Sequence, residues 1–159
     1  MRVGTGFDAH PLTAGRRLML GGIEVPFDKG LGGYSDADVL IHAIIDALLG
    51  AAALGDIGSH FPSGEPQYKD VSSLILLAKV RDKLTENGWR VSNVDATIVA
   101  DGPKLIYFID QMRQKVSETL GVDISQVSIK ASTSDGLGFV GRGEGMAAYA
   151  VALIESVLV

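Results

Sequence analysis

The chain has 159 residues, the size of one globular domain, and its 47% apolar and 21% charged residues exclude a mainly disordered protein. The net charge of −5 and the sequence pI near 5.1 argue against nucleic-acid binding. The absence of cysteine excludes disulfides, thiolate metal sites and cysteine nucleophiles.

The chain offers no segment suited to a membrane or to secretion. The longest apolar stretch, residues 39–54, is interrupted by His42 and Asp46, whereas a membrane span needs roughly 20 largely uncharged residues. The N-terminus has no apolar signal-peptide core. We therefore expect a cytoplasmic protein that binds neither membrane nor nucleic acid.

The first predicted elements are a strand over residues 2–7, a strand pair over 17–25 and a helix over 35–54. Ser35-Asp36-Ala37-Asp38 resembles a capping box at the start of this helix, with Asp in place of Glu. Gly55 is expected to close the helix.

The rest of the chain predicts further strands and helices. They are, in order, a loop over 56–70, a helix over 71–87, a strand over 91–100, a helix from Pro103 to before Gly121, a strand over 127–133, a glycine-rich loop over 136–145 and an apolar segment over 146–157. Alternation along that last segment favours a strand. The outline is an α+β protein of one domain, residues 1–159, with helices on one face of a mixed four- to five-stranded sheet.

Asp8, His10 and His42 form the first candidate site. Asp8 and His10 stand two apart at the end of a predicted strand, so both point to the same side. Two histidines and a carboxylate with an open fourth position are typical of a catalytic zinc site.

Asp38, His42 and Asp46 stand four apart on the predicted helix and form one polar stripe. Asp46 could therefore orient His42 toward a metal. Alternatively, the stripe is the solvent edge of the helix, and Asp8 only caps a turn.

Two further segments could bind phosphate. Lys104 follows Pro103 at a predicted helix start, where free amides attract anions, although a solvated lysine is equally possible there. Three hydroxyl residues and Asp135 end the strand over 127–133; they could contact phosphate oxygens and Mg²⁺, or simply form a polar strand end. Arg142 and Glu144 could be a surface ion pair or a phosphate or interface contact.

These pieces together resemble the 2-C-methyl-D-erythritol 2,4-cyclodiphosphate synthase family over essentially the whole chain. The motifs that carry the resemblance are Gly6-Phe7-Asp8-Ala9-His10, Ser35-Asp36-Ala37-Asp38 with His42, Asp46-Ala47-Leu48-Leu49-Gly50, Leu54-Gly55-Asp56-Ile57-Gly58, Phe61-Pro62, Pro103-Lys104, and Gly138-Phe139 with Gly141-Arg142-Gly143-Glu144-Gly145.

The resemblance implies a ferredoxin-like fold and a homotrimer with active sites between subunits, located in a bacterial cytoplasm or in a plastid after removal of a transit peptide. It implies that 4-diphosphocytidyl-2-C-methyl-D-erythritol 2-phosphate is cyclised, with release of CMP. It further implies Zn²⁺, or another divalent cation, at Asp8, His10 and His42, and Mg²⁺ or Mn²⁺ on the substrate diphosphate.

The family's other site positions carry over to this chain by residue. Tyr34 and Thr133 are implied to assist the transition state. The substrate-binding residues implied are Ser35, Asp56, Ile57, Gly58, Phe61, Pro62, Ser63, Gly64, Glu65, Ala100, Asp101, Gly102, Pro103, Lys104, Leu105, Ile106, Ser132, Ser134, Asp135, Phe139 and Arg142.

This chain departs from the family pattern at three positions: Tyr34 replaces His, Asp135 replaces Glu, and Ser63 replaces an acidic residue. Tyrosine can donate a hydrogen bond to a phosphate oxygen but carries no positive charge at neutral pH. Two other functions remain open from the sequence: a zinc-dependent phosphohydrolase and a non-catalytic trimer that binds isoprenoid phosphates.

Overall fold

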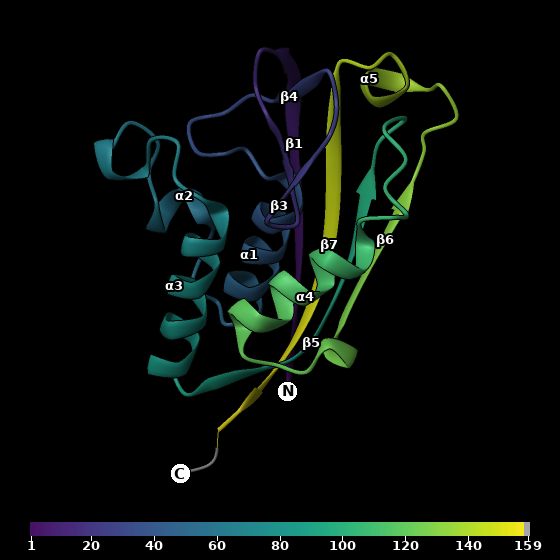
Figure 1. Ribbon diagram of the computed structural model, residues 1–159. Helices are drawn as coiled ribbons and strands as arrows, with labels where there is room; N and C mark the ends of the chain where they lie inside the picture. Colours follow the sequence, from purple (N-terminus) through teal and green to yellow (C-terminus); the bar gives the residue numbers. More distant parts are fainter. Residues whose placement is uncertain (158–159) are drawn as a thin grey trace.

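A computed structural model describes residues 1–157 of the chain (Figure 1). Its centre is a mixed five-stranded sheet in the order β4-β1-β7-β5-β6, in which β5 and β6 are parallel and the other neighbours antiparallel. These strands are β1 (Arg2–Ala14), β4 (Lys29–Leu31), β5 (Trp89–Val99), β6 (Val127–Ser132) and β7 (Gly145–Ser156). Beside the sheet, β2 (Leu18–Leu20) and β3 (Ile23–Val25) form the predicted strand pair.

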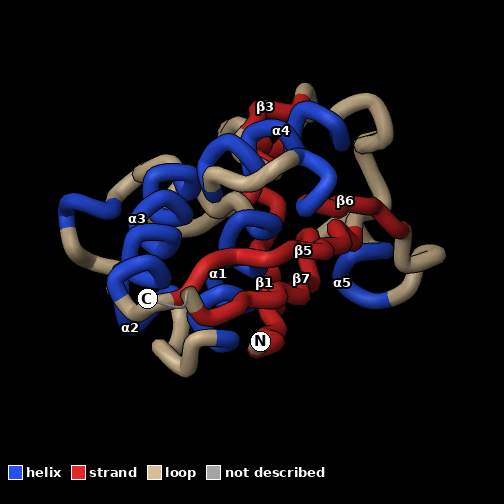
Figure 2. The backbone as a smooth tube through the Cα atoms, turned by 90° about the horizontal axis from the view of Figure 1, so that it is seen from below, coloured by secondary structure: helices blue, strands red, loops and turns tan. Residues whose placement is uncertain are grey.

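Three long helices cover one face of the sheet, as the sequence predicted. Figure 2 shows α1 (Val39–Ala51), α3 (Ser73–Glu86) and α4 (Ile109–Leu120) gathered on one side of the strands. The hydrophobic core fills the space between them, and α1 is buried almost all round. Each fully buried Leu or Ile contributes about 1.5–3 kcal/mol there.

Two glycines of β1 allow α1 to lie directly against the sheet. A Cβ on Gly4 would overlap the carbonyl oxygen of Ala47, and one on Gly6 would overlap that of Ala43. Small residues thus face each other from both elements, and the helix axis comes close to the strand. This approach carries His42, the neighbour of Ala43, toward the end of the same strand face.

The predicted capping box at the start of the first long helix is wrong. The helix starts at Val39, and Asp38 is its N-cap, with the Asp38 side chain accepting a hydrogen bond from the Ile41 N–H at 3.1 Å. The helix also ends earlier than predicted, because Leu54 N–H bonds back to the Leu49 carbonyl around a left-handed Ala53.

The third long helix starts at Ile109, six residues after the predicted start at Pro103. Its buried residues Met112, Val116 and Leu120 repeat every four positions, and the helix begins directly after a turn in which the Phe108 N–H bonds to the Leu105 carbonyl. Residues 103–108 form an irregular segment instead, with Leu105 buried in the core.

Smaller differences concern strand and loop lengths. β1 continues to Ala14, well past the predicted end, because it pairs with β7 as far as Gly145 and then with β4. The predicted loops contain short helices: α2 (Ile57–His60), the 3₁₀ turn Pro66–Tyr68 and α5 (Gly138–Gly141); a further 3₁₀ turn, Ile124–Gln126, precedes β6. Over residues 1–157, no helix combines the length and apolar character needed to cross a membrane.

Candidate metal and substrate site

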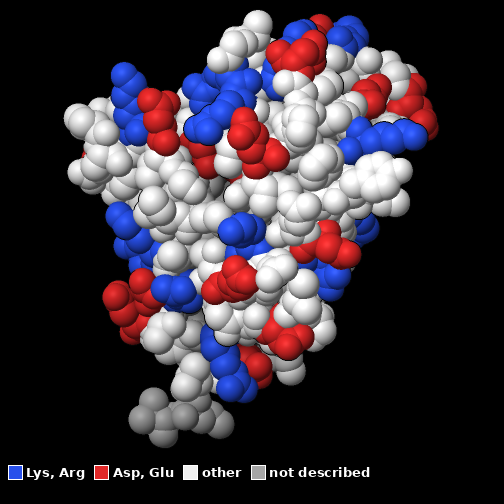
Figure 3. Space-filling model, in the orientation of Figure 1, with Lys and Arg blue, Asp and Glu red and all other residues white. Residues whose placement is uncertain are grey.

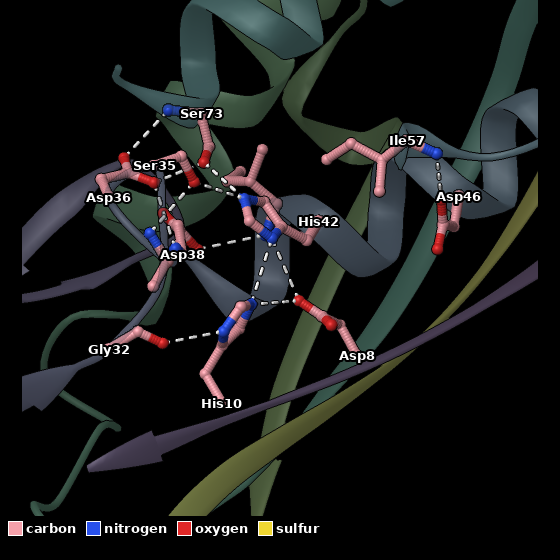
Figure 4. Close-up of polar contacts among 12 residues, drawn as sticks. Asp8, His10, Gly32, Ser35, Asp36, Asp38, His42, Asp46, Ile57 and Ser73 are labelled. Atoms are coloured by element: carbon pink, nitrogen blue, oxygen red, sulfur yellow. Dashed lines mark hydrogen bonds and ion pairs between the residues drawn. The ribbon is translucent and has the colours of Figure 1, made fainter. Parts of the chain in front are cut away.

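The side chains of Asp8, His10 and His42 converge on one point (Figure 4). Asp8 Oδ2 lies 2.8 Å from His10 Nε2 and 3.1 Å from His42 Nδ1, and the two histidine nitrogens are 3.3 Å apart. The alternation of β1 supplies the first two residues, and the close packing of α1 supplies the third.

This donor set fits a divalent metal. Two imidazole nitrogens and a carboxylate oxygen are the ligands of catalytic zinc sites, and ligands about 2.0–2.1 Å from a tetrahedral zinc stand about 3.3 Å from one another. The observed separations of 2.8–3.3 Å are equal to this spacing or slightly shorter. His10 Nδ1 donates a hydrogen bond to the Gly32 carbonyl at 3.1 Å. The lone pair of His10 Nε2 is therefore available to bind a metal.

The electrostatics of the group keep Asp8 ionised. Burial alone would raise the pKa of the Asp8 carboxyl, but hydrogen bonds and charge from His10 and His42 outweigh burial and lower this pKa to about 2. Burial likewise opposes the charged form of His10, yet the contact with Asp8 raises the His10 pKa above its ordinary value. The carboxylate therefore attracts positive charge to this point.

The two aspartates of the polar stripe have other roles than predicted. Asp38 is fully buried and accepts hydrogen bonds from the Gly21 and Gly22 N–H groups at 3.0 and 2.7 Å, so it is neither at a solvent edge nor at the metal group. Asp46 accepts from the Ile57 N–H at 2.8 Å and thereby anchors α2. Among the contacts of residues 1–157, Asp46 makes no hydrogen bond with His42, so it does not orient that ring as the sequence suggested.

A cavity of about 200 Å³ opens beside the metal group. It is lined by that group, by further predicted site residues and by two apolar neighbours from α3 and the turn before it, in chain order Asp8, His10, Tyr34, Ser35, His42, Ile57, Gly58, Phe61, Ser63, Tyr68 and Leu76. The Tyr34 hydroxyl donates to the Glu65 carbonyl at 3.0 Å, which ties down the segment over 61–65. Asp56, Pro62, Gly64 and Glu65 belong to the same segments without lining the cavity.

A second cavity, of about 220 Å³, lies at the ends of β5 and β6. Its lining comprises Ala100, Asp101, Pro103, Lys104, Leu105, Ile106, Ala131, Ser132 and Thr133. Gly102 lies in the same loop, and Ser134 joins it by hydrogen bonds from its N–H and hydroxyl to Asp101 at 3.0 and 3.2 Å. Lys104 stands in this irregular loop, so the predicted anion site at a helix start is wrong.

The remaining predicted residues lie on the surface near these cavities. Asp135, in a left-handed conformation, accepts from the Thr133 hydroxyl at 3.3 Å. Arg142 pairs with Glu144 at 2.9 Å, and Phe139 lies in α5; neither Arg142 nor Phe139 lines the two cavities. A larger cleft of about 640 Å³, near the start of β5, holds none of the predicted site residues.

Two residues near the metal group escaped sequence analysis. Ser73 is fully buried at the start of α3, with its hydroxyl 2.9 Å from His42 Nε2, and Asp36 accepts hydrogen bonds from both the Ser73 hydroxyl and its N–H. Ser73 is 31 residues from His42. No spacing rule relates two residues so far apart, and no signal in a single sequence could have found this contact.

A mixed sheet with helices on one face and an Asp-His-His group beside a cavity defines an α+β protein with a candidate divalent-metal centre. The particular family follows from comparison with known proteins: the chain belongs to the YgbB family, whose model matches residues 1–155.

Curated relatives of this chain share one name, 2-C-methyl-D-erythritol 2,4-cyclodiphosphate synthase. The protein from Syntrophomonas wolfei is 59% identical over 155 residues, covering 98% of this chain and 99% of the relative. That from Desulforamulus reducens is 58% identical, with the same coverage of 98% and 99%.

Solved structures agree with the family. The bifunctional IspDF from Campylobacter jejuni matches with a TM-score of 0.94 and 39% identity over 98% of this chain, which covers 42% of that longer chain. The IspF–CDP complex from Plasmodium falciparum matches with a TM-score of 0.86 and 29% identity, over 99% of this chain and 97% of that one.

Proposed function

We propose that this protein cyclises 4-diphosphocytidyl-2-C-methyl-D-erythritol 2-phosphate to 2-C-methyl-D-erythritol 2,4-cyclodiphosphate and releases CMP. The observation that carries the proposal is the Asp8, His10 and His42 group at the wall of a cavity, in a chain that is 59% identical to a curated relative of this name. In this reaction the 2-phosphate attacks the β-phosphorus of the diphosphate, and the bond from that phosphorus to the CMP oxygen breaks. Residues 1–159 act as one synthase domain.

The two cavities divide the substrate between them. The cavity at the metal group takes the methylerythritol phosphate, with Asp56, Ile57, Gly58 and the segment over 61–65 around its hydroxyls. The cavity over 100–106 takes the cytidine, a role supported by the complex that the Plasmodium falciparum IspF forms with CDP. Ser132 to Asp135 stand at its edge, where backbone and hydroxyl donors can hold the diphosphate.

The reaction needs positioning and charge neutralisation more than covalent work from the protein. A divalent ion held by Asp8, His10 and His42, and Mg²⁺ or Mn²⁺ with Asp135, would supply the positive charge that phosphates require. Basic and acidic side chains are interspersed on the face in Figure 3, so side-chain charge alone is weakly suited to that task. Tyr34 and Thr133 contribute hydroxyl donors to phosphate oxygens in the transition state.

A homotrimer would bring these cavities together. They share no lining residue, and the family resemblance pairs the nucleotide cavity of one subunit with the metal group of a neighbour. The sheet face opposite the helices exposes Val3, Phe7, Tyr149 and Val151, an apolar surface that a neighbouring copy would cover. On the family resemblance alone, we also propose the ferredoxin-like description of the fold and a cytoplasmic location.

The experiment is phosphorus NMR of purified protein with the diphosphocytidyl-methylerythritol phosphate substrate, Zn²⁺ and Mg²⁺. The expected products are the cyclic diphosphate and CMP in equal amounts. Linear phosphates would instead mean that water is the nucleophile, as in a phosphohydrolase. Unchanged substrate with measurable binding would mean that the protein only binds such ligands, and either outcome would overturn the proposal.

A further inference from the structure

The side of His42 that faces away from the metal group is fully engaged. His42 Nε2 lies 2.9 Å from the Ser73 hydroxyl oxygen and 3.1 Å from that of Ser35 (Figure 4). His42 itself is only 8% exposed and Ser73 is fully buried, so water does not compete for these contacts. The protons on these side chains therefore have few alternative acceptors.

The Ser73 hydroxyl has one proton, and Asp36 takes it. The hydroxyl donates to Asp36 Oδ1, while the Ser73 N–H donates to Asp36 Oδ2 at 2.9 Å. A carboxylate only accepts hydrogen bonds, and so the Ser73 oxygen has only lone pairs left for His42. If the 2.9 Å contact is a hydrogen bond, its hydrogen belongs to His42 Nε2, and the Ser35 hydroxyl, which can donate or accept, then accepts from the same N–H.

We propose that Asp36 and Ser73 are positioning residues that fix His42 as the Nε2–H tautomer, so that Nδ1 always presents a lone pair to the metal. The inference rests on the metal-dependent function proposed above. It concerns residues outside the three that hold the metal.

Fixing this tautomer affects the side of the His42 ring that faces the metal group. With both imidazoles neutral, His10 donates from Nδ1 to Gly32, so His10 Nε2 and His42 Nδ1 are both without a proton and face each other at 3.3 Å, at 2.8 and 3.1 Å from Asp8 Oδ2. Three lone-pair atoms pointing at one spot repel one another unless a proton or a metal cation lies between them. The orienting contacts thus prepare the group for a metal and disfavour its empty form.

The backbone supports this arrangement. Ala37 has a left-handed conformation with φ of 56° and is fully buried, and it separates two neighbouring carboxylates. Asp36 turns toward α3, whereas Asp38 turns toward Gly21 and Gly22. A non-glycine residue in this conformation is strained, and the surrounding hydrogen bonds must offset that strain.

The test measures the His42 tautomer without substrate. The ¹⁵N-histidine-labelled apoprotein is examined by two-bond ¹H–¹⁵N correlation at a pH where the imidazoles are neutral, with signals assigned by replacing His10 and His60 in turn. The unchanged protein is expected to show His42 as the Nε2–H tautomer. Asp36→Ala frees the Ser73 proton to donate to Nε2, so it should shift His42 toward the Nδ1–H tautomer.

Zinc affinity gives the second readout. Ser73→Ala removes the acceptor and leaves only Ser35, whose hydroxyl can donate or accept, so we expect mixed tautomers and a zinc affinity roughly 10–100-fold weaker in chelator competition. Ser73→Thr keeps the hydroxyl and should restore both. The control is Ser117→Ala, which removes another buried hydroxyl, one that donates to the Gln114 carbonyl in α4.

An Nδ1–H tautomer in the unchanged protein would overturn the proposal, and this measurement stands even where Ser73→Ala fails to fold. A folded Ser73→Ala protein that keeps the unchanged tautomer, with a zinc affinity within about twofold of the control, would also overturn it, because a hydrogen-bond partner of a metal ligand should matter more than that. Neither readout involves turnover, so failure of the proposed function is recorded separately by the phosphorus NMR experiment.

Discussion

Identical side chains on one helix face can have unrelated roles. Asp38 and Asp46 flank His42 at equal spacing, but the first closes the start of α1 from inside the core and the second holds α2 from a half-buried position. Asp38 accepts hydrogen bonds from Gly21 and Gly22 between β2 and β3, whereas Asp46 accepts one from Ile57 in α2. The role of a residue in this site is therefore set by the element opposite it.

The buried Asp38 predicts a pH dependence of stability. Burial, together with the nearby charge of Asp36, raises its pKa from 3.8 to about 6 against three backbone hydrogen bonds that lower it. Between these pH values the folded state keeps a proton that the unfolded state releases, so the free energy of unfolding falls as the pH rises through this window. Urea denaturation from pH 4 to 7 should show this slope.

Asp38→Asn provides the comparison. Asparagine has one acceptor oxygen and does not titrate, so the variant should be less stable overall yet show a flatter profile across the same pH window. Equal slopes for the two proteins would mean that Asp38 titrates normally.

Asp46 predicts an effect on substrate affinity. Asp46→Ala leaves the Ile57 N–H without its 2.8 Å partner, which costs about 1 kcal/mol and loosens the segment that carries Gly58. We expect KM to rise roughly fivefold with zinc content unchanged, because about 1.4 kcal/mol corresponds to tenfold. Asp46→Asn keeps an acceptor oxygen and is the matched control; a loss of zinc in Asp46→Ala would contradict this role.

At the scale of elements, the contact between α1 and β1 positions the metal group. Gly4 and Gly6 bring the helix backbone against the strand, and the same strand face continues to Asp8 and His10. The distance between His42 and those two residues is thus set by small residues of α1 that begin with Ala43, directly after His42. Substitutions at these glycines should therefore change the geometry of the metal group although they do not contact it.

Two glycine substitutions on opposite sides of this contact should have opposite effects. Gly50 lies in the last turn of α1, where an added Cβ would meet only the Thr5 carbonyl oxygen at 3.8 Å. Gly50→Ala should raise the free energy of unfolding by about 0.5–1 kcal/mol, since glycine is a poor helix residue. Gly6→Ala would overlap the Ala43 backbone and should cost at least about 1–3 kcal/mol.

Chemical denaturation of both variants tests this prediction, and zinc binding adds a second readout. Gly6→Ala should also weaken zinc binding, because the helix that carries His42 must move. If Gly6→Ala were as stable as the unchanged protein, the close helix–strand contact would be wrong.

At the scale of the whole molecule, the exposed sheet face is the surface that assembly would cover. Phe7 and Tyr149 pack together on it with ring centroids 4.9 Å apart, and Val151 is 45% exposed beside them. A charged side chain within a buried interface is strongly unfavourable. The face therefore offers a direct test of the trimer.

Val151→Lys should convert the proposed trimer to monomers in sedimentation equilibrium and should abolish turnover, because in that assembly the two cavities that share a substrate come from different subunits. Its far-UV circular dichroism should stay unchanged, since the residue is exposed in the subunit. Ile75→Lys, at an exposed position of α3, is the control and should remain a trimer. A fully active Val151→Lys monomer would contradict the proposed assembly.

The sequence by itself determined the class of fold and the pieces of the site. Period-two alternation predicted β7, Gly88 and Gly121 indicated where α3 and α4 end, and the Asp-x-His spacing put Asp8 and His10 on one strand face. These are local properties, because the direction of a side chain follows from the backbone of its own element.

Only the tertiary structure decided which groups complete the site. Ser73 meets His42, Asp46 meets Ile57, and Asp38 meets Gly21, all across contacts between separate elements. The start of α4 likewise differs from the position that Pro103 indicated, because residues 103–108 form a loop and a turn whose Leu105 is buried in the core. Hydrogen bonds and packing between remote segments depend on where whole elements lie, and that placement is a property of the assembled core.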